Sequence, residues 1–186
     1  MADLLADWTR RLRASDAAAL DEVMGALHPP LLRYAARLTS DRDAAYDVLQ
    51  EAFIKLWQTR ATLDPALSLR AFLYRVVYHL ALNHNRMKRR ESAAYAALPA
   101  QDESAAPGPA EALDAERLGA HIGRWIAELP PRRQEAFRLS RFDGLSHDEI
   151  AHVMGLSPAT VTTHIMLALQ YLRDRLHTYQ IDGHRA

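Results

Sequence analysis

Apolar residues recur every three or four positions along most of this chain, with polar residues between them. This spacing gathers apolar side chains on one face of an α-helix, and no stretch shows the sustained alternation of a half-buried strand. Two adjacent apolar rows are clearest between residues 44 and 57, namely Ala44, Val48, Ala52 and Leu56, and Ala45, Leu49, Phe53 and Trp57. The pattern therefore predicts an all-α protein.

Three helices are predicted in the first sixty residues. The first runs from Asp16 to Leu27, and the pair Pro29-Pro30 is expected to end it and to open a second that reaches about Thr39. Ser40 is expected to cap a third helix, which carries the two apolar rows. The other side of this third helix is polar and holds Asp43, Asp47, Gln50, Glu51 and Lys55.

A fourth helix is predicted from Ser68 to Arg90, with one apolar and one basic face. Its expected core positions are Leu69, Phe72, Leu73, Val76, Val77 and Leu80. The opposite row holds Arg75, His79, Leu82, Arg86 and Arg90, with Lys88 and Arg89 beside it. A helix dipole accounts for one or two cations in a last turn, not for four in five residues, so this end indicates a negatively charged partner.

The C-terminal third has the punctuation of a helix-turn-helix. Ser146 and Glu149 form a capping-box pattern, and Gly155 supplies a left-handed residue at the end of that helix. Ser157 and Pro158 are typical of the start of the next helix. Apolar residues fall where the two helices must face each other: Ile150, Met154, Leu156, Val161 and Ile165. Two helices crossed in this way are a common reader of the major groove.

Composition separates two small domains. Residues 92–112 are rich in alanine, proline, serine and acids and cannot form a core, so they are expected to be a flexible linker between residues 1–91 and 113–186. The formal net charge of the 186 residues is zero, yet no Lys or Arg lies between Arg90 and Arg117. The net charge of zero is a sum of opposite local charges, so it hides the basic end of the predicted fourth helix.

Other classes of protein are disfavoured by what the sequence lacks. It has no cysteine, which excludes disulfides and thiolate metal sites, and it has no apolar run suited to a signal peptide or membrane span, so a cytoplasmic protein is expected. His147 and His152 are five residues apart, which places their rings on different helix faces and argues against a metalloprotease-like zinc site. We expect no enzyme activity, no metal and no cofactor.

Three segments carry a family resemblance. Two segments resemble the second conserved domain of bacterial sigma factors, specifically those of the short extracytoplasmic-function (ECF) group. They are DVLQEAFIKLW at 47–57 and SLRAFLYRVVYHLALNHNRMKRR at 68–90. The fourth domain of that group is similar to LPPRRQEAFRLSRFDGLSHDEIAHVMGLSPATVTTHI at 129–165. The resemblance implies a protein that binds core RNA polymerase and directs it to particular promoters.

The resemblance also assigns roles to residues. It implies that Asp47, Gln50 and Glu51 dock on the clamp helices of the largest polymerase subunit. The implied minus-ten DNA contacts are Tyr74, Arg75, His79, Arg86, Lys88, Arg89 and Arg90, with part of a base pocket built by the loop at 58–68. His79 and Tyr78 stand where asparagine and arginine are usual in the family, so the family's base preference does not carry over.

For the minus-thirty-five element, the expected contacts lie near the start of the second helix-turn-helix helix. They are Ala159, Thr160, Thr162, Thr163, His164 and Met166, with Arg132 and Arg133 of the preceding helix supplying phosphate contacts. Threonine methyl groups suit thymine methyls, and hydroxyl and imidazole groups suit base edges. This helix has no Lys or Arg before Arg173, although members of the family commonly have basic residues where Thr162 and His164 stand.

Two alternatives remain at the level of sequence. One is a sigma-like decoy that sequesters an anti-sigma factor, and the other is an independent helix-turn-helix repressor, which needs no polymerase-docking helix. If the chain is a sigma factor, an anti-sigma partner is expected. The TVTTHI and SRFDGLS runs resemble members controlled by FecR-type membrane proteins.

Overall fold

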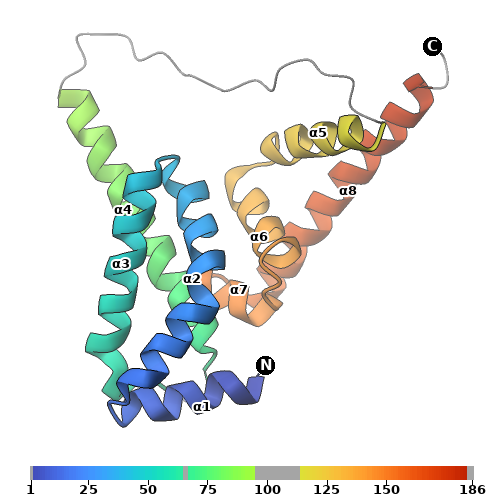
Figure 1. The fold of residues 1–186 in the computed structure, drawn as a ribbon. Helices are drawn as coiled ribbons and strands as arrows, with labels where there is room; N and C mark the ends of the chain where they lie inside the picture. The colour runs from blue at the N-terminus through green and yellow to red at the C-terminus, as the bar shows by residue number, and fades with distance from the viewer. Residues whose placement is uncertain (1, 65–66, 95–113, 184–186) are drawn as a thin grey trace. The chain divides into compact units, whose positions relative to one another are not determined.

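The computed structural model describes residues 2–64, 67–94 and 114–183, which form helices joined by short turns, without a strand (Figure 1). The all-α prediction is therefore confirmed. Contacts divide the chain into two compact units, Met1–Ala97 with Asp148–Leu156, and Leu98–His147 with Ser157–Ala186. The predicted linker at 92–112 falls mostly outside the described residues, so its boundaries stay a prediction. None of the described helices is both long and apolar enough to cross a membrane.

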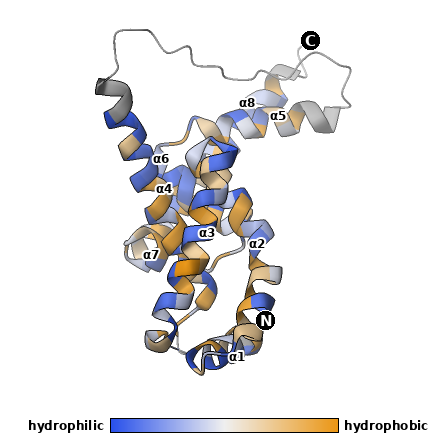
Figure 2. Ribbon diagram, turned by 60° about the vertical axis from the view of Figure 1, so that its left-hand side comes forward, coloured by the Kyte–Doolittle hydropathy of each residue, from blue (hydrophilic) through white to orange (hydrophobic). Residues whose placement is uncertain are grey.

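The first unit is built on three helices that pack against one another. These are α2 (Ala17–Thr39), α3 (Arg42–Thr59) and α4 (Leu69–Ala94), and the 3-10 turn η1 (Arg60–Thr62) follows α3 (Figure 1). Hydrophobic and hydrophilic residues alternate in bands along these helices, as expected when one side of each helix is buried (Figure 2). In α3, both predicted apolar rows are buried except for Trp57, which is half-buried.

Helix α1 (Ala2–Arg13) was not among the predicted helices. It packs against α2 through the buried side chains of Trp8 and Leu12, and the indole Nε1 of Trp8 donates to Glu22 at 2.8 Å. Arg11 also donates to Glu22 at 2.9 Å and to Asp16 at 2.7 Å. These bonds stabilise the charged carboxylates and lower the pKa of both Glu22 and Asp16.

Two boundary predictions were wrong. Pro29 and Pro30 do not end the helix, because α2 continues through both from Ala17 to Thr39. Proline keeps a helical φ, but it lacks the N–H group and its ring crowds the carbonyl of residue i−4. Burial of Leu27 and Leu31 on either side of the pair favours continuation of the helix despite this cost. Ser40 does not cap α3. It ends α2 in the left-handed conformation with φ 53°, while the carboxylate of Asp41 accepts from the backbone N–H groups of Asp43 and Ala44.

Helix α4 is rotated about its axis relative to the predicted core face. Leu69, Leu73 and Val77 are buried as predicted, but Tyr74 is also fully buried, and its ring lies 4.9 Å from that of Tyr34 on α2. The predicted core residues Phe72, Val76 and Leu80 are only half-buried. Because α4 packs against both α2 and α3, its buried stripe is centred on the row that contains Tyr74.

The second unit contains α5 (Asp114–Ala127), α6 (Pro131–Arg141) and α8 (Pro158–Gly183). Helices α5 and α6 both contact α8, around a small core of Ile126, Leu129, Phe137 and Ala168. The short helix α7 (His147–Met154) precedes α8 in the chain. At one end of this core, Glu128 accepts hydrogen bonds from Tyr171 and Arg175 of α8, and these bonds lower its pKa.

Replacing Tyr74 with alanine tests the rotation of α4. The change leaves a cavity in a dense core, so we expect the free energy of unfolding to fall by about 3–5 kcal/mol. Leu82→Ala, on the same helix but 39% exposed, is the control and is expected to change it by less than about 1 kcal/mol. Urea denaturation followed by circular dichroism measures both, and equal small losses would contradict the burial of Tyr74.

Candidate nucleic-acid interface

The polar side of α3 carries Asp47, Gln50 and Glu51, and all three side chains are exposed. We call these three residues the acidic face. Their exposure follows from the burial of Val48, Leu49 and Ala52 on the opposite side of the helix, since one turn separates the two sets. This face presents two carboxylates and an amide to solvent.

An apolar groove, which is not among the predicted sites, adjoins the acidic face. It lies between α2 and α3 and includes Gln50, with Leu20, Met24, Tyr46 and Ile54 among its other lining residues. Tyr46 is 40% exposed and Ile54 is 48% exposed. The signal was present in the sequence, because Ile54 stands one turn from Gln50 on the polar side of the helix.

The exposed side of α4 carries Arg75, His79, Arg86, Arg89 and Arg90, which we call the basic face. These positions follow one another at helical spacing, so a single extended partner can contact the whole row. Arg86, Arg89 and Arg90 also line a shallow hollow near the end of the helix, together with Leu82 and Asn85. Asn85 fixes this end of α4, since its Nδ2 donates to the backbone oxygen of Leu38 at 2.8 Å.

Two of the predicted minus-ten contacts, Tyr74 and Lys88, are not part of the basic face. Tyr74 is a core residue and presents no surface to DNA, because neighbouring helices cover it completely. The assignment of Tyr74 as a minus-ten contact is therefore corrected. Lys88 is exposed, but its Nζ lies 3.7 Å from the carboxylate of Asp41, so part of its charge is already balanced.

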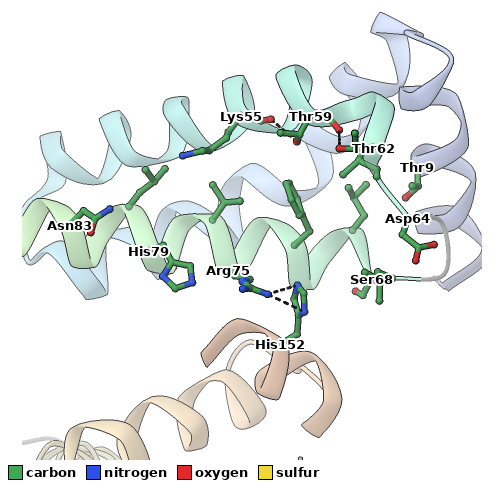
Figure 3. Close-up of a pocket in the computed structure, with 16 residues that line it drawn as sticks. Thr9, Lys55, Thr59, Thr62, Asp64, Ser68, Arg75, His79, Asn83 and His152 are labelled. Carbon is green, nitrogen blue, oxygen red and sulfur yellow. Dashed lines mark hydrogen bonds between the residues drawn. The ribbon is translucent and has the colours of Figure 1, made fainter. Parts of the chain in front are cut away.

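A pocket of about 430 Å³ opens beside the basic face (Figure 3). Lys55 and Thr59 of α3 lie on one side of it, and Arg75, His79 and Asn83 of α4 lie on the other. Apolar residues also line the pocket: Leu63, Leu67, Leu69, Phe72, Val76 and Leu80. The rotation of α4 explains this lining, since the half-buried row that the core does not use faces the pocket.

The turn between α7 and α8 has the predicted geometry. Gly155 adopts φ 64°, and the N–H of Leu156 donates to the backbone oxygen of Ala151 at 3.0 Å, as in a glycine-ended helix. The hydroxyl of Ser157 accepts from the N–H of Thr160 at 3.1 Å, and α8 begins at Pro158. The predicted cap and turn residues around Gly155, Ser157 and Pro158 are therefore confirmed.

The predicted reading surface lies on the first turns of α8. Ala159, Thr163 and Met166 are exposed, whereas Thr160, Thr162 and His164 are half-buried. The hydroxyls of Thr162 and Thr163 donate to the backbone oxygens of Pro158 and Ala159, each at 3.0 Å. On α6, Arg132 is exposed and Arg133 is half-buried, so Arg132 is the more accessible of the two to a phosphate.

Comparison with known families gives two matches in the order of the chain. The family description "Sigma-70 region 2" matches residues 23–91, and "Sigma-70, region 4" matches residues 121–172. The first match contains the acidic face, the basic face and the residues of α3 and α4 that line the pocket. The second contains α6, α7 and the first half of α8.

Curated proteins similar to this chain carry the same family name. The ECF RNA polymerase sigma factor SigE of Mycolicibacterium smegmatis is 31% identical over 161 residues, covering 84% of this chain, which spans 61% of SigE. The ferric citrate uptake sigma factor FecI of Escherichia coli is 27% identical over 161 residues, covering 86% of this chain and 92% of FecI.

A solved structure shows the same fold. It is the sigma factor RpoE in complex with the anti-sigma factor NepR from Bartonella quintana, with a TM-score of 0.64 and 20% identity, covering 84% of this chain and 96% of that one. Both family matches, the named relatives and the shared fold agree. The chain therefore belongs to the sigma-70 family of RNA polymerase sigma factors, and within it to the extracytoplasmic-function group.

Proposed function

We propose that this chain initiates transcription through three separate surfaces. The acidic face of α3 binds the clamp helices of the largest subunit of core RNA polymerase. The basic face of α4, with its pocket, binds the minus-ten element. The start of α8, with Arg132 and Arg133 of α6, reads the minus-thirty-five element.

The pocket beside the basic face is the observation that carries this proposal. A flipped base needs an apolar surface for its ring and hydrogen-bonding groups for its edge, while its phosphate needs a nearby cation. Phe72 and Val76 offer the first, Asn83 the second and Arg75 the third, all from one helix. An acidic face suited to a protein partner lies on the same unit, so this unit has one surface for polymerase and one for DNA.

At the minus-thirty-five element, the reading surface is suited to specificity more than to affinity. Methyl groups of Thr162 and Thr163 and the exposed thioether of Met166 suit thymine methyls, and the ring of His164 suits a base edge. No arginine or lysine lies on α8 before Arg173, so phosphate binding falls to Arg132 and Arg133. Tight binding to this element therefore requires the polymerase-bound chain.

In vitro transcription with purified core polymerase and a promoter library tests the proposal directly. We expect the full chain to bind core and to start transcription from a defined subset of promoters. A decoy would bind an anti-sigma factor but not core, and a repressor would bind DNA without core. Either of those outcomes would overturn the proposed function.

Charge reversal tests the acidic face. Asp47→Arg with Glu51→Arg is expected to abolish binding to core while leaving the fold intact, because exposed substitutions usually change stability by about 0.5 kcal/mol or less. The matched control is Asp21→Arg with Asp174→Arg, which reverses two exposed carboxylates elsewhere. Affinity for core is measured by titration with a labelled chain. Unchanged affinity in the first variant would reject the docking surface.

The salt dependence of promoter binding tests the basic face. Changing Arg86, Arg89 and Arg90 to glutamine is expected to weaken binding to all promoters and to reduce the log–log salt slope by about 0.9 for each duplex phosphate that is no longer neutralised. Lys88→Gln is the internal comparison, and we expect a smaller effect because Lys88 pairs with Asp41. An unaltered slope in the triple variant would mean that these arginines do not bind phosphates.

An anti-sigma protein of the FecR type is the partner we propose for regulation. Support comes from the similarity to FecI over 92% of that protein and from the run TVTTHI at the start of α8. Titration of the full chain with the cytosolic segment of a FecR-type protein from the same organism is expected to give a specific complex. Absence of binding there, with intact core binding, would assign regulation to another class of protein.

A further inference from the structure

His147 is the first residue of α7, and its spacing from His152 argues against a metal site. Its side chain is exposed, and its ring nitrogen Nδ1 lies 3.0 Å from the hydroxyl oxygen of Thr162 on α8. Both residues belong to the second compact unit. The hydrogen bond therefore joins a residue outside the predicted reading surface to a residue within it.

The direction of this hydrogen bond follows from counting protons. The hydroxyl of Thr162 has one proton, and it is directed at the backbone oxygen of Pro158 at 3.0 Å. A carbonyl oxygen accepts and never donates, so both interactions are hydrogen bonds only if Nδ1 of His147 carries a proton and donates to Thr162. The alternative, with the hydroxyl donating to His147, makes one bond instead of two.

The hydroxyl of Thr162 is consequently held in one hydrogen-bonding state. Its proton is used by Pro158 and one oxygen lone pair by His147, which leaves the second lone pair as its only remaining hydrogen-bonding capacity. Thr163 provides the contrast on the next position of the same helix. Among the described residues its hydroxyl bonds only to Ala159, so no second bond holds it there and its proton can turn to donate elsewhere.

We propose that His147 is a positioning residue of the minus-thirty-five reading surface, which holds Thr162 as an acceptor. In the major groove an acceptor pairs with an exocyclic amine, which only adenine N6 and cytosine N4 provide. At the base pair that Thr162 reads, the protein then prefers adenine or cytosine on the contacted strand over guanine or thymine. This inference rests on the proposed binding of α8 to the minus-thirty-five element.

Selection of bound sites from a randomised minus-thirty-five library, using the polymerase-bound full chain, tests the base preference. Wild type is expected to favour adenine or cytosine at one base pair, and His147→Ala to reduce that preference by about three- to tenfold, the range of a single net hydrogen bond. Thr162→Val keeps the shape but removes the hydroxyl, and it is expected to reduce the preference at the same base pair.

The double variant separates positioning from direct binding of the base. If His147 acts through Thr162, adding His147→Ala to Thr162→Val does not change the base preference further, because Thr162→Val has already removed the hydroxyl oxygen that His147 holds. His177→Ala, an exposed histidine farther along α8, is the control and leaves all preferences unaltered. An unchanged preference in His147→Ala, or a uniform loss of binding to all sequences, overturns the inference.

The tautomer of His147 provides a test that needs no DNA. Nitrogen-15 NMR of the free full chain is expected to show neutral His147 with its proton on Nδ1, and Thr162→Val is expected to remove that preference. A neutral ring with its proton on Nε2 in the wild type would overturn the inference while leaving the proposed function untouched. If instead the polymerase-bound wild type selects no minus-thirty-five sequence, the proposed function itself fails.

Discussion

The rotational position of α4 is the constraint on which the proposed DNA-binding side of the first unit depends. It is fixed by burial of Tyr74 against Tyr34, together with Leu73 and Val77, between α2 and α3. A helix is rigid about its axis, so burying one row determines the direction of every other row. Arg75 and His79 are exposed because Tyr74 is not, and the row of Phe72, Val76 and Leu80 becomes the wall of a pocket.

The same packing separates the two kinds of charge. Cationic side chains gather on the exposed side of α4, while the carboxylates of Asp47 and Glu51 project from α3. The formal net charge of zero is therefore no obstacle to DNA binding, because the local field at each surface decides which partner approaches it. A nucleic acid is attracted to one side and a basic protein surface to the other. Lys88 is an exception to this separation, because it forms an ion pair with Asp41 at the start of α3.

In the proposed reading of the minus-thirty-five element, specificity depends on hydroxyl groups rather than on long cationic side chains. A hydroxyl discriminates between bases only when its proton has a fixed direction, because a freely rotating hydroxyl donates or accepts equally well. In α8 the backbone oxygens of Pro158 and Ala159 attract those protons, and His147 adds a second constraint at Thr162 alone. Thr162 and Thr163 therefore differ in the hydrogen-bonding groups that they leave available. The difference arises from a neighbour fifteen residues away in sequence.

The sequence by itself determined the features that depend on local periodicity and on backbone conformation. The two apolar rows of α3, the left-handed Gly155 and the cap at Ser157 all follow from short-range rules, and the resemblance to sigma factors follows from the order of such segments. Continuation of α2 through Pro29 and Pro30 was decided by tertiary packing, because burial of the flanking leucines outweighs the missing N–H bonds. The burial of Tyr74, the pocket behind Arg75 and the bond between His147 and Thr162 were decided there too. Each of these features depends on which side chains of one helix contact another helix in the fold. Helical spacing alone does not determine that contact.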